Sequence, residues 1–389
     1  MVQKPINFLK ELLSNQRNIP FGFNMILPES GKTFVSERIV TAPEKMVVVK
    51  DIPDYLEVEF NDLVNKFRTA KIKTLEGYYI ELSAFDGYDD YLKLKISSKR
   101  RSNLRKYQRR LEQCFDIRYT IYCGAIDQQE YRRLFEVMEE FLKRRFTEKK
   151  EVNYEIPHLR EMEELLYDLI LSKKASLFVI YHNNRPISIR INMFYKELAY
   201  YIISGYDIDY SAFHIGAIDM LKNIEWCMEN RFTRYDLLKG YADYKKNWTT
   251  HRYYNYDHLI YQPGSLKQLS KKALLFAKLQ LRYGFLKLSR QFGFYNGLKK
   301  LKKIVYTLRF GTKSIKYHWT SPAIDLSPGH EIRVFDDPEY CALRRPVYDY
   351  LFRHKEQLED IGVFALASHN DKFLLKGKNA SRILIINKR

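Results

Sequence analysis

The segment SLFVIYHNNRPISIRINMFYKELAYYIISGYD, residues 176–207, carries the clearest strand pattern in the chain. Apolar and aromatic residues dominate it, and an AsnAsnArgPro turn at 183–186 separates its first two runs. This pattern predicts a meander of three strands at 176–182, 186–195 and 197–205.

Helical periodicity flanks the meander on both sides. Residues 127–175 carry apolar side chains at three- and four-residue intervals, which predicts two amphipathic helices. A further helix is expected at about 213–229, and RFTRYDLLKG follows it as a short strand or loop. The order helix, helix, three strands, helix and strand predicts one α/β (α+β) domain with a mixed sheet.

The N-terminal segment, up to about residue 95, has the punctuation of a small α/β unit. Its β-rich runs are MVVV at 46–49, YLEVEF at 55–60 and YYIELSAF at 78–85, and ProGluSerGly at 28–31 predicts a turn. A helix rich in Lys and Arg, SSKRRSNLRKYQRRLEQ, follows at 97–113.

Residues 264–316 contain fourteen Lys or Arg and no Asp or Glu. Helical spacing places basic residues on one face (Lys267, Lys271, Lys278 and Arg282) and apolar residues on another (Leu266, Leu269, Ala273, Phe276 and Tyr283). We interpret the stretch as a basic amphipathic arm that contacts an anionic membrane or nucleic acid, or alternatively as a helical hairpin packed on the rest of the protein. Residues 317–389 return to balanced charge and are expected to form a small accessory module.

Composition limits the classes of function. Hydrophobic residues make up 46% of the 389 positions and aromatic residues 15%, which excludes a disordered chain. The formal net charge of +19 favours an anionic partner such as a phosphate-bearing cofactor, a nucleic acid or an acidic membrane surface.

The four cysteines have no metal-ligand spacing, so we expect neither a metal site nor a disulfide framework. Without an apolar segment long enough to span a bilayer, and without a signal-peptide core, the protein is expected in the cytoplasm, peripheral to the inner face of the membrane if the arm binds there.

Three motifs in order carry a family resemblance. The first is the basic helix at 97–113, the second is YYIISGYDIDYSAFHIGAIDMLKNIEW at 200–226, and the third is YDLLKGYADYKKNW at 235–248. Residues 40–262 thereby resemble the BioF2-like branch of the GNAT acyltransferase superfamily, which includes the cellulose-biosynthesis protein CelD. The third motif is similar to the family's Asp-x-x-x-Gly-x-x-x-Tyr-Lys-x-x-Trp ending.

The resemblance implies tandem GNAT-like domains, as in the Fem-type aminoacyltransferases. The expected domains are a degenerate first half at 1–115, an acyltransferase domain at 116–263, the arm at 264–316 and the accessory module at 317–389. One departure bears on the donor. Where many family members have Ser-Pro-Gly, this chain has His214, Ile215 and Gly216, and only the glycine is retained.

The implied reaction moves an acyl group from a thioester to an amine that attacks directly, so no nucleophilic Ser or Cys is needed. Acyl-CoA, with acetyl-CoA as the simplest case, is the implied co-substrate. Its pyrophosphate would lie at the backbone N–H groups where the helix begins, at His214, Ile215 and Gly216, and the histidine could add a donor. The alternative for Gly216 is close helix packing alone.

The attacking amine must lose a proton, and Asp236 is the first candidate for the base. Its alternative role is a salt bridge to Arg234 or Lys239 that holds the loop. Asp207 lies just past a central strand, where it could bind the acceptor amine or make only local turn hydrogen bonds.

Tyr244 is the candidate acid that reprotonates the leaving thiolate, and Lys245 is a candidate ligand for an anionic acceptor or the donor phosphates. The alternative is that a TyrLys pair in a Tyr-rich chain carries no function. Arg190 alternates with two isoleucines on a predicted strand, where it faces either an acceptor cleft or solvent.

Three functions therefore stay open from the sequence. The first is an N-acyltransferase of cell-envelope or exopolysaccharide metabolism that uses acyl-CoA and an amine or amino-sugar acceptor. The second keeps the fold and uses aminoacyl-tRNA as the donor, which the net charge would suit. The third is a catalytically inactive basic protein that binds a membrane or nucleic acid. The acyl length, the acceptor and the oligomeric state are not determined by the sequence.

Overall fold

The computed structural model describes residues 5–14, 23–27, 32–36, 46–60, 67–240, 243–264, 266–291, 294–311, 316–321, 328–334, 337–366 and 369–387. The turn predicted at 28–31 lies outside these residues. The fold is mixed α/β, as predicted, with a nine-stranded sheet in the order β1-β4-β12-β6-β11-β10-β9-β8-β7. The chain divides into two compact units. Unit 1 comprises Met1–Tyr91, Met193–Ile202 and Cys227–Leu301, and unit 2 comprises Leu92–Asn192, Ile203–Trp226 and Lys302–Arg389.

The units are discontinuous in sequence, because strands that are distant along the chain pair with one another. The domain boundaries predicted after residues 115, 263 and 316 do not coincide with the unit boundaries and stay predictions.

Unit 1 is built on long antiparallel strands. Strand β12 (His251–Tyr261) lies between β4 (Val47–Pro53) and β6 (Arg68–Glu81) and is antiparallel to both. Strand β11 (Arg234–Lys239) pairs antiparallel with β6 and parallel with β10 (Leu198–Tyr206), which makes the sheet mixed.

Shorter elements complete unit 1. They are β1 (Ile6–Asn7), α1 (Phe8–Ser14), η2 (Leu82–Ala84), α7 (Asp243–Lys246) and a separate three-stranded sheet of β3 (Lys32–Ser36), β2 (Phe23–Leu27) and β5 (Glu57–Phe60). Helix α2 (Tyr88–Lys95) begins in unit 1 and ends in unit 2. The strand predicted at 55–60 is confirmed only from Glu57 onward, because Tyr55 lies in the turn before it.

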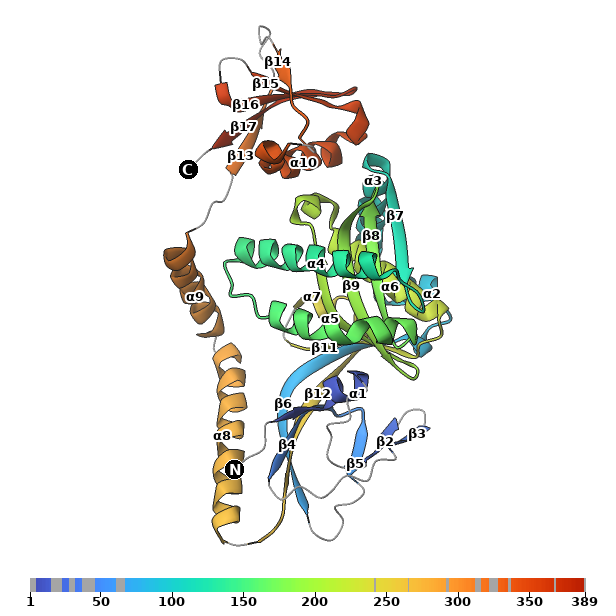
Figure 1. Ribbon diagram of the computed structural model, residues 1–389, viewed down its shortest axis with the longest axis vertical. Coiled ribbons are helices and arrows are strands. Elements are labelled where there is room, and N and C mark those ends of the chain that lie inside the picture. Colours follow the sequence, from blue (N-terminus) through green and yellow to red (C-terminus); the bar gives the residue numbers. More distant parts are fainter. Residues whose placement is uncertain are drawn as a thin grey trace. The chain divides into compact units, whose positions relative to one another are not determined.

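The predicted meander is confirmed as β8 (Ala175–His182), β9 (Arg185–Tyr195) and β10. Nearly every side chain of β8 and β9 is buried, which explains the continuous apolar run. The predicted helices are α3 (Ser98–Cys114), α4 (Gln128–Lys149), α5 (Ile156–Leu171) and α6 (Ile215–Glu229), with η3 (Ile208–Phe213) before α6 and β7 (Ile117–Tyr122) after α3. Helices α4 and α5 lie side by side in unit 2 (Figure 1).

The C-terminal residues form an antiparallel sheet in the order β13-β17-β16-β15-β14, and α10 (Arg344–His354) lies across one face of it (Figure 1). The strands are β13 (Lys316–Thr320), β14 (Pro328–Glu331), β15 (Gly362–Leu366), β16 (His369–Lys376) and β17 (Ser381–Asn387), with short turns η4 (Pro338–Leu343) and η5 (Leu358–Asp360).

This C-terminal part shares one hydrophobic core with the earlier part of unit 2. Val347, Tyr348 and Leu351 of α10 are buried in one cluster with Phe115 and Phe213. The region expected to be an accessory module therefore packs against residues of α3 and η3, and a smaller cluster of its own contains Leu366, Leu374 and Ile383.

The arm at 264–316 contains two helices, α8 (Leu266–Gln291) and α9 (Phe294–Phe310), as its periodicity predicted. Within the described residues, no helix is long and apolar enough to cross a membrane.

Candidate functional site

Asp236 lies on β11 immediately before an irregularity in the sheet. Asp236 pairs with Tyr79 of β6 while Lys239 pairs with Gly77, so β11 contains one extra residue at this point. Leu238 adopts a left-handed conformation with φ of 61°, and its backbone N–H donates to Oδ1 of Asp236 at 2.7 Å. A bulge of this kind turns a strand locally and redirects a side chain, and bulges are common beside active sites.

Two tyrosine hydroxyls complete the environment of the Asp236 carboxylate. Tyr55 donates to Oδ2 at 2.6 Å, and Tyr253 donates to Oδ1 at 3.0 Å. The two rings meet edge to face, with centroids 4.9 Å apart. Gly77 makes room for this arrangement, because a Cβ there would lie 2.1 Å from Cζ of Tyr253.

Burial determines the electrostatics of the cluster. Asp236 is 1% exposed, and this desolvation raises the pKa of its carboxyl to about 6, although the hydrogen bonds from Tyr55, Leu238 and Tyr253 counteract it. Burial and the nearby Asp236 raise the pKa of Tyr55 well above its ordinary value, so its hydroxyl keeps its proton and donates it. The carboxylate therefore titrates close to neutral pH while its donors do not.

Lys245 links α7 to the bulge. Its ammonium donates to the carbonyl oxygens of Leu238 and Lys239, each at 3.1 Å, and its side chain is 7% exposed. Burial lowers the pKa of Lys245 to about 8, and the charge of Asp236 opposes this shift. The structure thus brings the predicted residues Asp236 and Lys245 to the same bulge.

Tyr244 lies differently from its neighbour Lys245. Its side chain is 44% exposed, whereas the groups that donate to Asp236 are Tyr55, Tyr253 and the N–H of Leu238. Trp248, the last residue of the motif, is buried, and its carbonyl accepts from Tyr91 at 2.7 Å.

The alternative role for Asp236 is a salt bridge to Arg234 or Lys239, and the structure gives each of these two residues a different carboxylate partner. Arg234 pairs with Glu81 at 2.6 Å, and Lys239 pairs with Asp51 at 2.5 Å. Both basic residues have carboxylate partners of their own, which leaves Asp236 with neutral donors.

The predicted donor site begins at His214, which lies between η3 and α6. His214 has a left-handed conformation, with φ of 52°, and η3 ends there. The His214 carbonyl accepts hydrogen bonds from the N–H groups of Ala217 and Ile218. The N–H groups of Ile215 and Gly216 lie in the first turn of α6, where backbone N–H groups have no acceptor within their own helix. The Ile215 side chain is buried in the core of unit 2, so only its backbone could meet a ligand. A Cβ on Gly216 would lie 3.3 Å from the Tyr206 ring, which supports the close-packing role weighed for this glycine.

Arg190 was expected to face either an acceptor cleft or solvent. In the structure its side chain lies in the interior instead. Its side chain is 2% exposed and its Nε donates to Oδ2 of Asp219 at 2.6 Å. A buried guanidinium needs such a partner, because an unpaired charge in the interior is costly.

Asp207 is 1% exposed and holds a turn together. Its carboxylate accepts from Arg144 at 2.7 Å, from Arg185 at 3.1 Å and from the N–H of Asp209 at 3.1 Å. The hydrogen bond from Asp209 is the local turn role expected for Asp207, and the two arginines add ion pairs to it. Both carboxylate oxygens therefore already accept hydrogen bonds, which leaves little capacity to bind an acceptor amine.

Sequence reasoning missed Tyr55 and Tyr253. Burial alternates along β12 from Tyr253 to Asp257, but the sequence did not indicate this face as the inner one, because Tyr253 shares it with the polar residues Asn255 and Asp257. Tyr55 carried no local signal, because it lies in a turn 181 positions from its partner.

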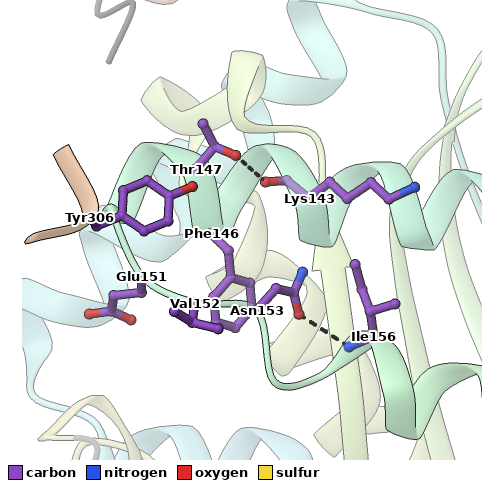
Figure 2. A pocket seen from close by; sticks show the side chains of 8 residues that line it. All are labelled: Lys143, Phe146, Thr147, Glu151, Val152, Asn153, Ile156 and Tyr306. Carbon is purple, nitrogen blue, oxygen red and sulfur yellow. Dashed lines mark hydrogen bonds between the residues drawn. The ribbon is translucent and has the colours of Figure 1, made fainter. Parts of the chain in front are cut away.

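A cavity of about 220 Å³ lies elsewhere, in unit 2 (Figure 2). It is lined by Lys143, Phe146, Thr147, Glu151, Val152, Asn153, Ile156 and Tyr306, and it contains none of the predicted site residues. Its volume is below the roughly 300 Å³ at which small-molecule pockets begin, so we do not assign the donor to it. Among the described residues, no group of His, Cys, Asp and Glu could hold a metal ion.

Comparison with known proteins gives a class for one region. Residues 98–246, from the start of α3 to the end of α7, match the family model described as an acetyltransferase (GNAT) domain. This region contains Asp236, Tyr244 and Lys245. No curated protein matches the sequence.

Solved structures similar to the chain include a conserved protein of unknown function from Bacteroides thetaiotaomicron, with 12% identity and a TM-score of 0.39 over 56% of this chain and 71% of that chain. L-PGS from Bacillus licheniformis has 13% identity and a TM-score of 0.36 over 61% of this chain and 73% of its own. FemX has 12% identity and a TM-score of 0.36 over 47% of this chain and 62% of its own.

Proposed function

We propose that the protein is an N-acyltransferase that moves an acyl group from acyl-CoA, or a related thioester, to an amine. The observation that carries the proposal is the buried Asp236 carboxylate, whose pKa is raised to about 6, in a region that matches a GNAT domain. In this reaction the amine nitrogen bonds to the thioester carbonyl carbon, the carbon–sulfur bond breaks, the nitrogen loses a proton and the thiolate gains one.

Asp236 acts as the general base. A base works best when its pKa is near the operating pH, since it must be ionised and still bind a proton well. Tyr55 relays the amine proton to the carboxylate, because its hydroxyl is hydrogen-bonded to Oδ2 and can give its own proton to Asp236 as it accepts the new one; Tyr55 is 7% exposed and Asp236 is 1% exposed. The short Tyr55 to Asp236 hydrogen bond favours this relay.

Tyr244 acts as the acid that protonates the leaving thiolate, and its side chain is 44% exposed. Lys245 holds the bulge in place through Leu238 and Lys239, and its positive charge favours an anionic acceptor or the donor phosphates. The donor pyrophosphate binds at the first-turn N–H groups of α6 beside His214. Arg190 and Asp207 are not assigned to substrate, because both are buried with partners of opposite charge.

The finer assignment follows the three sequence motifs. They support the BioF2-like branch and, with it, an amine or amino-sugar acceptor of cell-envelope or exopolysaccharide metabolism.

A second candidate donor is aminoacyl-tRNA. Helix α3 exposes Arg105, Lys106 and Arg109, and a basic helix of this kind suits a polyanionic donor.

Calorimetric titration with acetyl-CoA and with a longer acyl-CoA, at low and moderate salt, tests the proposal. Saturable binding that survives moderate salt is expected, because a shaped thioester site does not depend on charge alone. The Asp236→Asn variant should bind the donor equally well and lose turnover with amine acceptors. Absence of thioester binding, with salt-sensitive tRNA binding in its place, would favour the second donor.

A further inference from the structure

Helix α8 is attached to unit 1 by one face. Leu279 is buried, and the hydroxyl of Tyr283 donates to Oδ2 of Asp257 on β12 at 3.2 Å. Figure 1 shows α8 as a long straight helix, and it contacts β6 of the same unit. These contacts determine which side of α8 faces the strands of unit 1 and which side faces away from them.

The outward side of α8 is apolar rather than polar. Four large residues at spacings of seven, four and three form one stripe, and each is between 52% and 74% exposed: Leu274, Leu281, Phe285 and Leu288. The sequence indicates Leu266, Leu269, Ala273, Phe276 and Tyr283 as the apolar face. Phe276 and Tyr283 lie on the partly buried side, so a second apolar stripe remains in solvent.

Helix α9 repeats the pattern. Leu301, Ile304, Val305 and Leu308 follow the spacing of a single helix face, and they are between 55% and 82% exposed. Tyr306 points to the other side of α9, where it lines the cavity of unit 2 (Figure 2). Contiguous exposed apolar stripes are uncommon on soluble proteins and mark interaction surfaces.

Positive charge accompanies both stripes. Lys278 and Arg282 are exposed on α8, and Lys300, Lys303 and Arg309 are exposed on α9. The whole arm, residues 264–316, has fourteen Lys or Arg and no Asp or Glu. A partner for this surface must therefore combine apolar groups with negative charge.

We propose that α8 and α9 bind the surface of an anionic lipid bilayer, with the leucine stripes among the acyl chains and the basic residues at the headgroups. Helices with one apolar and one basic face lie in the plane of the interface in this way. Two copies of the chain would bring like charges together, which opposes self-association through the arm. Nucleic acid would satisfy the charge but offers no aliphatic surface to exposed Leu and Phe side chains.

Vesicle co-sedimentation of the full chain tests the proposal. The vesicles contain phosphatidylcholine alone or phosphatidylcholine mixed with phosphatidylglycerol, at about 0.1 M ionic strength, where the Debye length is about 10 Å. The protein should bind the mixed vesicles and not the neutral ones. The pair Lys278→Glu and Arg282→Glu should weaken binding about 25-fold or more, since each basic residue near such a surface contributes about fivefold.

A matched control is available on α3. Arg105→Glu with Arg109→Glu makes the same charge change at the same four-residue spacing on an exposed helix without an apolar stripe, and should change vesicle binding little. Leu274→Gln with Leu281→Gln should abolish binding, whereas Leu94→Gln with Leu171→Gln, two exposed leucines outside the arm, should not.

Equal losses in the arm and α3 charge variants would overturn the proposal, because binding would then follow net charge alone. The proposal would also be overturned if the wild-type chain did not bind anionic vesicles. Sedimentation velocity would then distinguish a monomer from a self-associating chain whose association the leucine variants abolish.

Discussion

The hydroxyl of Tyr55 donates a 2.6 Å hydrogen bond to Oδ2 of Asp236, across 181 positions of sequence. Tyr253 donates to the other oxygen from β12. Both tyrosines lie outside residues 98–246, the region that matches the GNAT domain. The candidate base is therefore oriented by parts of the chain on either side of that region.

The pH dependence of kcat/KM should be bell-shaped. Asp236 must be ionised to accept a proton, so activity should rise as the pH increases through about 6. Lys245 must be charged to favour an anionic ligand, so activity should fall as the pH increases through about 8. Steady-state rates in overlapping buffers measure both limbs, and a flat profile from pH 5 to 9 would contradict both assignments.

Asp236→Asn should abolish turnover. It should also remove the part of the pH dependence of the unfolding free energy that comes from the Asp236 carboxyl. The folded-state pKa of Asp236 is raised, so its stabilising contribution is present below about pH 4 and is lost as the pH rises through about 6. At roughly 1.4 kcal/mol per pKa unit, the loss is about 3 kcal/mol. Urea unfolding of wild type and variant between these pH values measures it, and parallel curves would show that Asp236 is not the titrating group.

Tyr253→Phe should move the acid limb of the activity profile to higher pH. The variant removes a hydrogen bond that lowers the pKa of Asp236, so the carboxyl pKa rises further above 6. The loss in unfolding free energy should be about 1 to 2 kcal/mol.

Tyr131→Phe is the control for that experiment. Tyr131 is also a buried tyrosine, and it donates to the Glu163 carbonyl at 2.6 Å. Its loss should lower stability without moving the acid limb, and an equal movement in both variants would refute the specific role of Tyr253.

Tyr244→Phe should reduce turnover with little effect on folding. The side chain is 44% exposed, and surface substitutions usually change stability by less than about 0.5 kcal/mol. Thermal unfolding and initial rates give the two readouts. A wild-type rate would remove Tyr244 as the acid that protonates the thiolate.

Arg190→Met should destabilise the protein by about 3 to 5 kcal/mol, because it leaves the carboxylate of Asp219 buried without its partner. The double variant Arg190→Met with Asp219→Leu should recover most of that loss, since it removes both charges. Denaturant unfolding measures the cycle. If the single variant kept its stability and raised only KM for the acceptor, Arg190 would bind substrate after all.

Local patterns predicted the elements well where a segment contacts its own neighbours. The meander ends within one residue of the predicted limits, and α3, α4, α5 and α6 follow the apolar spacing. The strand prediction at Tyr55 failed because β-propensity continues into the turn before β5, and propensity does not identify where pairing begins.

Residue type and motif spacing indicate candidate site residues, but they do not determine how deeply each side chain is buried. Asp236 and Lys245 meet at one bulge as the motif spacing indicated, while Arg190 and Asp207 are held by opposite charges on elements distant in sequence. No periodicity indicates that Asp219 or Arg144 will be the partner.

The mixed α/β class, the helical arm and its unbalanced charge can be predicted from the sequence alone, because these features depend on spacing and composition within short segments. The position of Asp236 among tyrosine hydroxyls and the exposure of the α8 leucines are seen only in the folded protein. A pKa and an exposed stripe both depend on which distant residues exclude water from a side chain, and strand pairing across the chain brings those residues together.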